Sequence, residues 1–423
     1  MEILRHCFPP SVRRILDELP ESLDETYERI LREIRKPNRG HAHRLLQCLV
    51  VAVRPLRVKE LAEVLAFNFD EGGTPKLDPG WRWEDQEEAV MSACSSLVTI
   101  VKDGDSRVVQ FSHFSVKEFL TAERLAEPIR DVSRYHIRLE GAHTILAQAC
   151  LGVLLRLDDH VDRDSIKSFP LARYAARYWV THARVENVSD RIKDGMECLF
   201  DADKPHFATW IWIHNKEQSS SMITMHPEKP EAVPLYHAAM FGLRDLAEHL
   251  ITKHPEHVNA RGGLHETPMH AAVEAGHANI ISLLIEHGAD IEARSKSING
   301  GTPLNRAAWD GRFEIGQYLL DHGADINSRD SNHHTPLMHA VMERKVEFAR
   351  MLLKRGAEIN ALSNYGGSAL SRAAQFGYTQ LVRLLLEHGA DANVCDDTGR
   401  TASYFTTQQE IVKLLSKYGA KSV

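Results

Sequence analysis

The chain has 423 residues, a length that suits two or three domains. Hydrophobic residues make up 43% of it and charged residues 26%, which is the composition of a folded globular protein. The formal net charge of −7 argues against a nucleic-acid binder that relies on excess positive charge. We expect no disulfide scaffold, no cysteine-type zinc site and a cytoplasmic location, because no two cysteines are close in sequence: Cys7, Cys48, Cys94, Cys150, Cys198 and Cys395.

Helical periodicity and one strand pair characterise the first 130 residues. Apolar residues recur at helical spacing in residues 19–31, 41–53, 57–67 and 86–96. The segments L-V-T-I-V (97–101) and R-V-V-Q-F (107–111) flank K-D-G-D-S, which indicates a β-hairpin, and a further helix is expected from Ser115. Helices followed by a hairpin predict a winged-helix domain over residues 1–129.

Charge argues against DNA binding by this domain. Residues 1–130 contain 19 Lys and Arg against 22 Asp and Glu, so their net charge is −3. A winged helix that reads phosphates needs a basic face. We therefore favour a structural or regulatory winged helix and expect no nucleic-acid partner.

Residues 130–230 are predicted to be a helical linker. The segment L-A-R-Y-A-A-R-Y-W-V-T-H-A-R, at 171–184, is the clearest helix in it. The longest apolar stretch of the chain, 142–155, includes His143 and Gln148 and is too short and polar to span a membrane.

An internal repeat fills residues 231–423. Versions of T-P-L-H-x-A-A-x-x-G begin at Val233, Thr267, Thr302, Thr335 and Ser368, and a degenerate copy that we expect to be a C-terminal cap begins at Thr401. The spacings are 34, 35, 33, 33 and 33 residues. The Thr or Ser caps a first helix, Pro suits its first position, and a Gly ends the second helix. Each unit is therefore predicted to be helix, turn, helix and projecting hairpin, stacked on its neighbours.

This pattern resembles the ankyrin repeat, with five full units and a shortened last one. Departures from the family pattern are visible. His270 alone keeps the motif histidine, and Arg344 stands where the turn glycine belongs. The resemblance implies a protein-binding scaffold without chemistry of its own.

The expected binding surface is the concave face of the repeats, where a protein ligand would dock. Its candidates include the pairs before each turn, four of which contain a large apolar side chain: Met240, Phe241, Trp309, Asp310, Met342, Glu343, Gln375 and Phe376. Hairpin tips would supply a polar rim: Arg261, Arg294, Lys296, Asn332, His334, Asn364, Tyr365 and Arg400. Alternatively, Phe241, Phe376 and Trp309 simply pack on the fold.

The N-terminal motifs carry a second resemblance. L-P-E-S-L-D-E-T-Y-E-R-I-L, R-P-L-R-V-K-E-L-A-E-V-L and V-Q-F-S-H-F-S-V-K-E-F-L are similar to the winged-helix segment of fungal NACHT-type signal-transduction ATPases, a module also named after GPI inositol-deacylase. In NACHT-ankyrin members a helical linker and ankyrin repeats follow. The resemblance thus implies the sensing and regulatory arm of such a receptor, working with a nucleotide-binding domain in cis or in trans.

Missing motifs argue against catalysis. The sequence has no G-x-x-x-x-G-K-[ST] loop and no G-x-S-x-G, so we expect neither nucleotide hydrolysis nor deacylation, and no cofactor. A site built on His113 with Ser112 and Ser115 is the weakest alternative. No group of His, Cys or carboxylate residues has metal-ligand spacing, and the recurrent His287, His322 and His388 fit helix ends.

Three hypotheses for the function fit this sequence. The first is the receptor arm, as a piece of a longer chain or as a gene product without its nucleotide domain. The second is a stand-alone ankyrin scaffold or adaptor. The third, a DNA-binding winged-helix regulator, is disfavoured by the charge.

Overall fold

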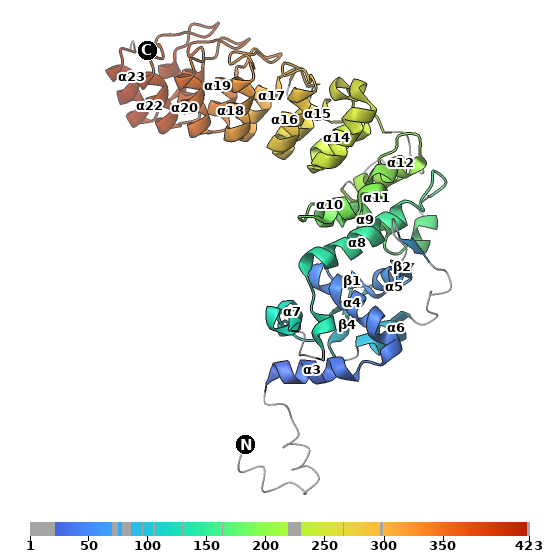
Figure 1. Cartoon of the computed structure of the whole chain (residues 1–423). Coiled ribbons are helices and arrows are strands. Elements are labelled where there is room, and N and C mark those ends of the chain that lie inside the picture. Colours follow the sequence, from blue (N-terminus) through green and yellow to red (C-terminus); the bar gives the residue numbers. More distant parts are fainter. Residues whose placement is uncertain are drawn as a thin grey trace, which may run out of the picture. The chain divides into compact units, whose positions relative to one another are not determined.

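The computed structural model describes residues 22–69, 75–77, 86–94, 96–104, 106–127, 131–162, 164–218, 230–264, 266–296 and 299–420. The chain divides into two compact units, Met1–Lys229 and Pro230–Val423 (Figure 1). No helix among the described residues is long and apolar enough to cross a membrane.

The first part of unit 1 has winged-helix topology. Its elements are α3 (Leu23–Glu33), η1 (Lys36–Asn38), α4 (Arg39–Val51), β1 (Leu56–Arg57), α5 (Val58–Leu65), α6 (Gln86–Cys94), β4 (Val98–Asp103), β5 (Ser106–Phe111) and α7 (Ser115–Thr121). The three strands form an antiparallel sheet in the order β1-β5-β4, with Ile100 opposite Val109. A small second sheet pairs β2 (Phe67–Asn68) with β3 (Lys76–Leu77). The predicted helices and hairpin are confirmed, although residues 19–21 of the first one lie outside the described residues.

Local capping explains where two of these helices begin. The Ser22 hydroxyl accepts the backbone N–H of Glu25 at the start of α3. At the start of α5 the Glu60 carboxylate accepts the backbone N–H of Arg57 at 2.8 Å and pairs with Arg54 at 2.6 Å. Glu60 is 1% exposed, so this ion pair is protected from the screening that weakens surface pairs.

The helical segment after the winged helix shares its core. It consists of η3 (Glu123–Ala126), η4 (Ser133–Tyr135), α8 (Leu139–Leu154), η5 (Ser165–Ser168), α9 (Ala172–Ala183), α10 (Val188–Arg191), α11 (Lys193–Leu199) and α12 (Pro205–Gln218). Helix α8 packs on both α4 and α9. The N–H of Leu171 before α9 donates to the Glu63 carboxylate of α5 at 2.7 Å. Trp179 and Trp210 fill the centre of the segment.

Unit 2 is a stack of helix pairs, which Figure 1 shows side by side with the hairpins projecting from one side of the stack. The first helices are α13 (Pro234–Phe241), α15 (Pro268–Ala275), α17 (Pro303–Asp310), α19 (Pro336–Met342) and α21 (Ala369–Gln375). The second helices are α14 (Arg244–Lys253), α16 (Ala278–Glu286), α18 (Phe313–Asp321), α20 (Val346–Lys354) and α22 (Thr379–Glu387). The shortened last unit is η8 (Ala402–Phe405) with α23 (Gln409–Lys417), and η6 (Pro255–Asn259) follows α14.

The motif residues act as their chemistry predicts. Side chains of Thr267, Thr302, Thr335 and Ser368 each accept the backbone N–H three residues later. The recurrent histidines place Nδ1 at 2.8 to 2.9 Å from the carbonyl four residues earlier, which caps the ends of the second helices: His287, His322 and His388. Arg344 takes the glycine's place at the turn with a φ of 55°.

A ladder of side-chain bonds joins each repeat to the next. The amide oxygens of Asn259, Asn327 and Asn360 accept the backbone N–H of Asp290, Glu358 and Asp391 at 2.8 to 3.0 Å. At the second step of the ladder Glu292 takes the place of Asn, and its carboxylate accepts the backbone N–H of Asp325 at 2.8 Å. The acceptor always precedes the donor by about one repeat, so neighbouring hairpins are held in register.

Gly316 in α18 lies against Phe348 of α20 and gives a stability prediction. A Cβ at this position would overlap the ring of Phe348, a buried side chain that is 2% exposed. Gly316→Ala is therefore expected to destabilise the protein by about 1–3 kcal/mol of overpacking, offset by about 1 kcal/mol of helix propensity. Urea denaturation would measure the difference.

Gly141 in α8 is the matched control, because no described residue lies within 4 Å of an added Cβ there. Gly141→Ala is expected to be neutral or slightly stabilising. Combining Gly316→Ala with Phe348→Leu is expected to recover part of the loss. A Gly316→Ala protein more stable than the wild type would show that the two helices separate easily.

Candidate protein-binding face

The predicted binding residues of the helices lie at the ends of the first helices, just before the turns. We call this surface, formed by residues 240–241, 274–275, 309–310, 342–343 and 375–376, the first-helix face. Trp309 is 36% exposed and Phe376 49% exposed, whereas Met240, Phe241 and Met342 are half-buried. The apolar stripe expected from the sequence is therefore partly buried, and Trp309 and Phe376 are its most exposed aromatic side chains.

Ring contacts show what these aromatic side chains touch. The Trp309 indole meets the His339 imidazole edge-on, with ring centroids 5.5 Å apart. Phe376 stacks on Tyr378 at 5.6 Å, and Phe241 stacks on His237 at 6.3 Å. Each contact is made within one repeat or with the next repeat. These aromatic side chains therefore pack on the fold and are also partly exposed to solvent.

Arg306 is a residue of this face that was not among the predicted candidates. Its guanidinium pairs with Asp310 at 2.8 Å in the same helix and with Glu274 of the preceding repeat at 3.1 Å. The spacing of four residues between Arg306 and Asp310 was a readable signal for a helical ion pair. A second Arg in the same motif position, Arg372, donates to Gln375 at 3.1 Å. The face therefore alternates charged and aromatic groups, and Glu343 adds a half-buried carboxylate.

Several predicted rim residues bind neighbouring hairpins. Arg261 donates to the Arg294 carbonyl at 3.0 Å and pairs with Glu266 at 2.6 Å. Arg294 in turn donates to the Arg329 carbonyl at 2.7 Å, and the Asn364 amide donates to the Ser331 carbonyl at 2.8 Å. These side chains contribute to the order of the array as well as to its surface.

Other rim residues point into solvent. The Lys296 side chain is 94% exposed and lies 3.5 Å from the Glu266 carboxylate, and Tyr365 is 71% exposed. Arg400 is half-buried and pairs with Asp396 at 2.8 Å. Lys296 and Tyr365 are thus the tip side chains most open to a partner among these candidates.

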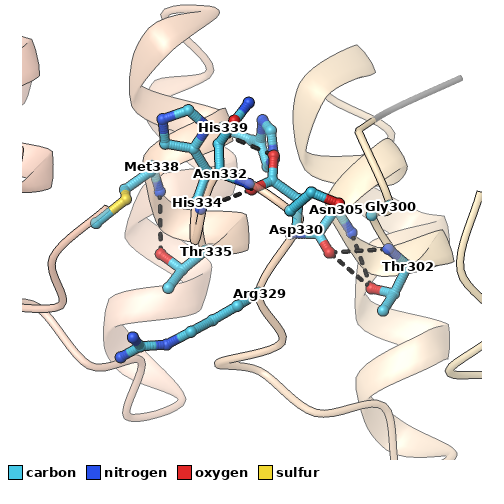
Figure 2. A network of polar contacts seen from close by, with 12 residues as sticks. Gly300, Thr302, Asn305, Arg329, Asp330, Asn332, His334, Thr335, Met338 and His339 are labelled. Carbon is cyan, nitrogen blue, oxygen red and sulfur yellow. Dashed lines mark hydrogen bonds and ion pairs between the residues drawn. The ribbon is translucent and has the colours of Figure 1, made fainter. Parts of the chain in front are cut away.

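A cluster of buried polar groups surrounds Asp330, and Figure 2 shows it at close range. One of its members, His339, contacts the Trp309 ring. Asn332 and His334 give their backbone N–H groups to Oδ1 of Asp330 at 2.8 and 2.7 Å. Burial alone would raise the pKa of Asp330, but the imidazoles of His334 and His339 and these N–H donors outweigh it, so the pKa is lowered. The sequence shows no metal-ligand spacing here, because these residues come together only when the hairpin folds back on α19.

Comparison with known proteins identifies the class of both parts. Residues 235–330 and 361–422 match the model "Ankyrin repeats (3 copies)", and 310–353 and 337–383 match "Ankyrin repeats (many copies)". Residues 27–129 match "GPI inositol-deacylase, winged helix domain". The chain therefore carries ankyrin repeats, a protein–protein interaction module, after a winged-helix domain of that type.

Individual relatives cover parts of the chain. The azaphilone pigments biosynthesis cluster protein L of Monascus ruber is 33% identical over 295 residues, which are 65% of this chain and 61% of that protein. Alpha-latrocrustotoxin-Lt1a of Latrodectus tredecimguttatus is 39% identical over 61 residues, 14% of this chain and 4% of the toxin. The chain spans about three fifths of the Monascus relative's length.

A solved structure also matches. The ankyrin repeat domain from Acinetobacter baumannii AYE is 32% identical in sequence and superposes with a TM-score of 0.41. The match covers 44% of this chain and 98% of the bacterial chain.

Proposed function

We propose that the ankyrin unit binds a protein ligand on the first-helix face, with Trp309 as its central contact. The observation that carries this proposal is a partly exposed indole flanked by the Glu274–Arg306–Asp310 ion pairs. Trp and Arg are the side chains that most often dominate protein interfaces, and a charged surround fixes orientation and register.

Loss of the apolar side chains of Trp309 and Met342 is expected to weaken binding of the protein ligand. In the full chain, Trp309→Ala combined with Met342→Ala should weaken recruitment at least ten-fold, in line with the cost of deleting a central aromatic contact. Affinity capture with quantitative mass spectrometry, followed by titration of the captured protein, measures the effect.

Val412→Ala with Tyr418→Ala is the matched control, because both residues are about as exposed as Trp309 and lie on or next to α23, away from the first-helix face. This control should recruit the partner normally. Undiminished recruitment by the Trp309 and Met342 variant would contradict the proposal.

The finer role that we propose is the sensing and regulatory arm of a NACHT-type receptor, acting without catalysis of its own in the cytoplasm. It is supported by the order of a winged helix, a helical segment and ankyrin repeats, together with the absence of a phosphate-binding loop. A nucleotide-binding domain would be supplied in cis or in trans.

Nucleotide binding separates this role from an enzymatic one. The purified 423-residue chain is expected to show no heat of binding with ATP or GTP in calorimetry. Tight binding of either nucleotide would refute the proposal. An in-frame phosphate-binding loop in the transcript upstream of Met1 would favour the receptor arm over the alternative, a stand-alone adaptor.

The winged helix itself favours regulation over DNA binding. Helix α6 precedes the hairpin, in the position of a recognition helix, and its nine residues Gln86–Cys94 include Glu87 and Glu88 but no Lys or Arg. Arg107 on the hairpin pairs with Glu87 at 2.7 Å. Salt-sensitive binding to duplex DNA would revive the DNA-binding alternative.

A further inference from the structure

The hairpin that leads into the fourth repeat holds a carboxylate in a fixed direction. Oδ1 of Asp330 accepts the backbone N–H groups of Asn332 and His334, and the N–H of Asp330 donates to the His334 carbonyl at 3.1 Å. His333 completes the tight turn in the left-handed region, with a φ of 60°. Because these bonds occupy Oδ1, the second oxygen, Oδ2, is left to face the imidazoles of His334 and His339.

The distances are too long for direct charge-assisted bonds. Oδ2 of Asp330 lies 3.4 Å from Nδ1 of His334 and 3.3 Å from Nε2 of His339. A direct N–H···O bond to a carboxylate is about 2.7–2.9 Å long. Bonds of about 2.0–2.1 Å to one tetrahedral ion, in contrast, place neighbouring ligand atoms about 3.3–3.4 Å apart. All three ligand atoms lie within 4.8 Å of one another.

The burial of these three side chains is a second, independent observation that points to a bound ligand. The side chains of Asp330, His334 and His339 are 0%, 12% and 4% exposed. Oδ2 of Asp330 and both ring nitrogens of His339 are buried and make no hydrogen bond to any residue that the structure describes. Buried polar atoms in folded proteins nearly always have partners, and a bound cation would satisfy the oxygen and one of these nitrogens together.

The other hairpins show that this arrangement is not a general feature of the repeats. The same backbone bond closes five hairpins, at Gly262–Glu266, Ser295–Gly301, Asp330–His334, Ser363–Gly367 and Asp396–Arg400. Asp396 repeats the carboxylate, but Arg400 binds its Oδ2 directly at 2.9 Å through Nε. Among the described residues of these hairpins, a carboxylate meets two histidines only at Asp330, beside His334 and His339.

We propose that Asp330, His334 and His339 form a binding site for a divalent zinc ion. Two neutral imidazoles and a carboxylate, with water in the fourth position, are a ligand set that zinc accepts in tetrahedral geometry. The ion would bind Oδ2, Nδ1 of His334 and Nε2 of His339. It would thereby tie the hairpin to α19 next to the Trp309 ring, which packs on His339.

Calorimetry on the full chain, freed of metal with a chelator and then dialysed, tests the site. Titration with zinc chloride is expected to show one bound ion per chain. His339→Gln and Asp330→Asn should each weaken this binding at least about 100-fold, beyond the loss typical of a residue outside the ligand set. Circular dichroism confirms that each variant is folded, and Asn retains the oxygen that accepts the hairpin N–H groups.

Two controls are matched to the site. His333→Asn changes the adjacent histidine for a residue that tolerates its positive φ, and should bind zinc normally. His254→Ala removes a member of the exposed His254–Glu256–His257 group, and should also leave the binding unchanged. Binding that survives His339→Gln, or that disappears with His254→Ala instead, would overturn the assignment.

Cobalt substitution tests the proposal without any variant. Cobalt(II) in a four-coordinate His and carboxylate site is expected to absorb strongly in the visible range, whereas hydrated six-coordinate cobalt absorbs weakly. The weak spectrum, or a wild-type chain that binds no zinc in the micromolar range, would overturn the site.

Discussion

Acidification from pH 7 to pH 5 is expected to destabilise unit 1 by about 2 kcal/mol through His182 alone, since each unit of pKa shift is worth about 1.4 kcal/mol. His182 is 0% exposed, in the interface between α9 and α8. Burial, and to a smaller extent the neighbouring His143, lower its pKa to about 3. In the folded protein this imidazole therefore stays neutral where a free histidine would be charged.

A chain of hydrogen bonds explains why the neutral form fits. The Val53 N–H donates to the Tyr174 hydroxyl at 3.1 Å, and that hydroxyl lies 3.0 Å from Nε2 of His182. Nδ1 of His182 lies 2.9 Å from Nδ1 of His143. Every group is satisfied when Tyr174 donates to Nε2 and the Nδ1–H of His182 donates to His143. A proton added to Nε2 would displace the Tyr174 donor.

The direction of the pH effect follows from the lowered pKa. Below pH 6.5, the ordinary pKa of histidine, His182 binds a proton in the unfolded chain but stays neutral in the folded chain. The free energy of unfolding therefore falls as the pH falls. The loss begins near pH 6.5 and continues to about pH 3, where the folded protein also takes up the proton.

Hydrogen exchange of α8 and α9 amides between pH 7 and pH 5, corrected for the intrinsic exchange rate, measures this stability. His182→Gln is the matched variant, because an amide can accept from Tyr174 and donate to His143 but does not titrate. Its stability should depend less on pH than that of the wild type. Parallel pH profiles for the two proteins would show that His182 is not the responsible group.

Replacement of Trp210 by Ala is expected to cost about 3–5 kcal/mol of unfolding free energy, the range for a fully buried aromatic side chain. Trp210 is 0% exposed, and its ring centroid lies 5.2 Å from that of Phe200 and 5.5 Å from that of Trp179. Its indole N–H donates to the Ala176 carbonyl at 3.0 Å. The substitution would remove a ring from the centre of the helical segment and leave a large cavity.

Trp309→Ala provides the comparison, because the same side chain is there 36% exposed. We expect it to cost about 1 kcal/mol or less, as for most surface substitutions. Urea denaturation followed by circular dichroism measures both variants. A Trp210→Ala protein as stable as the Trp309→Ala protein would mean that the aromatic cluster contributes little to unit 1.

Much of the fold was predictable because its signals are local. Thr267 and Thr302 cap helices through atoms three residues away, and the turn at Arg344 is specified by the residues around it. The period of about 33 residues then dictates stacking. The winged-helix order could likewise be read from helical periodicity followed by a strand pair.

What the sequence left open depends on contacts between distant residues. Glu63 and Leu171 are 108 positions apart, and no periodicity indicates that the helical segment joins the winged helix in one core. On the first-helix face, the sequence predicted that Trp309 would be a surface candidate but not that the Met342 side chain is half-buried. The approach of His339 to Asp330 depends on the fold of a hairpin, which spacing along the chain does not reveal.

The ladder of side-chain bonds between repeats affects how such a chain can change in evolution. Each step is self-contained, because the acceptor, for example Asn327, and the donor, for example Glu358, are about one repeat apart. Duplication or deletion of a whole repeat would therefore restore the same bonds at the new junction. The array can change its length without an orphaned hydrogen-bonding group, and its range of partners can change by recombination as well as by point substitution.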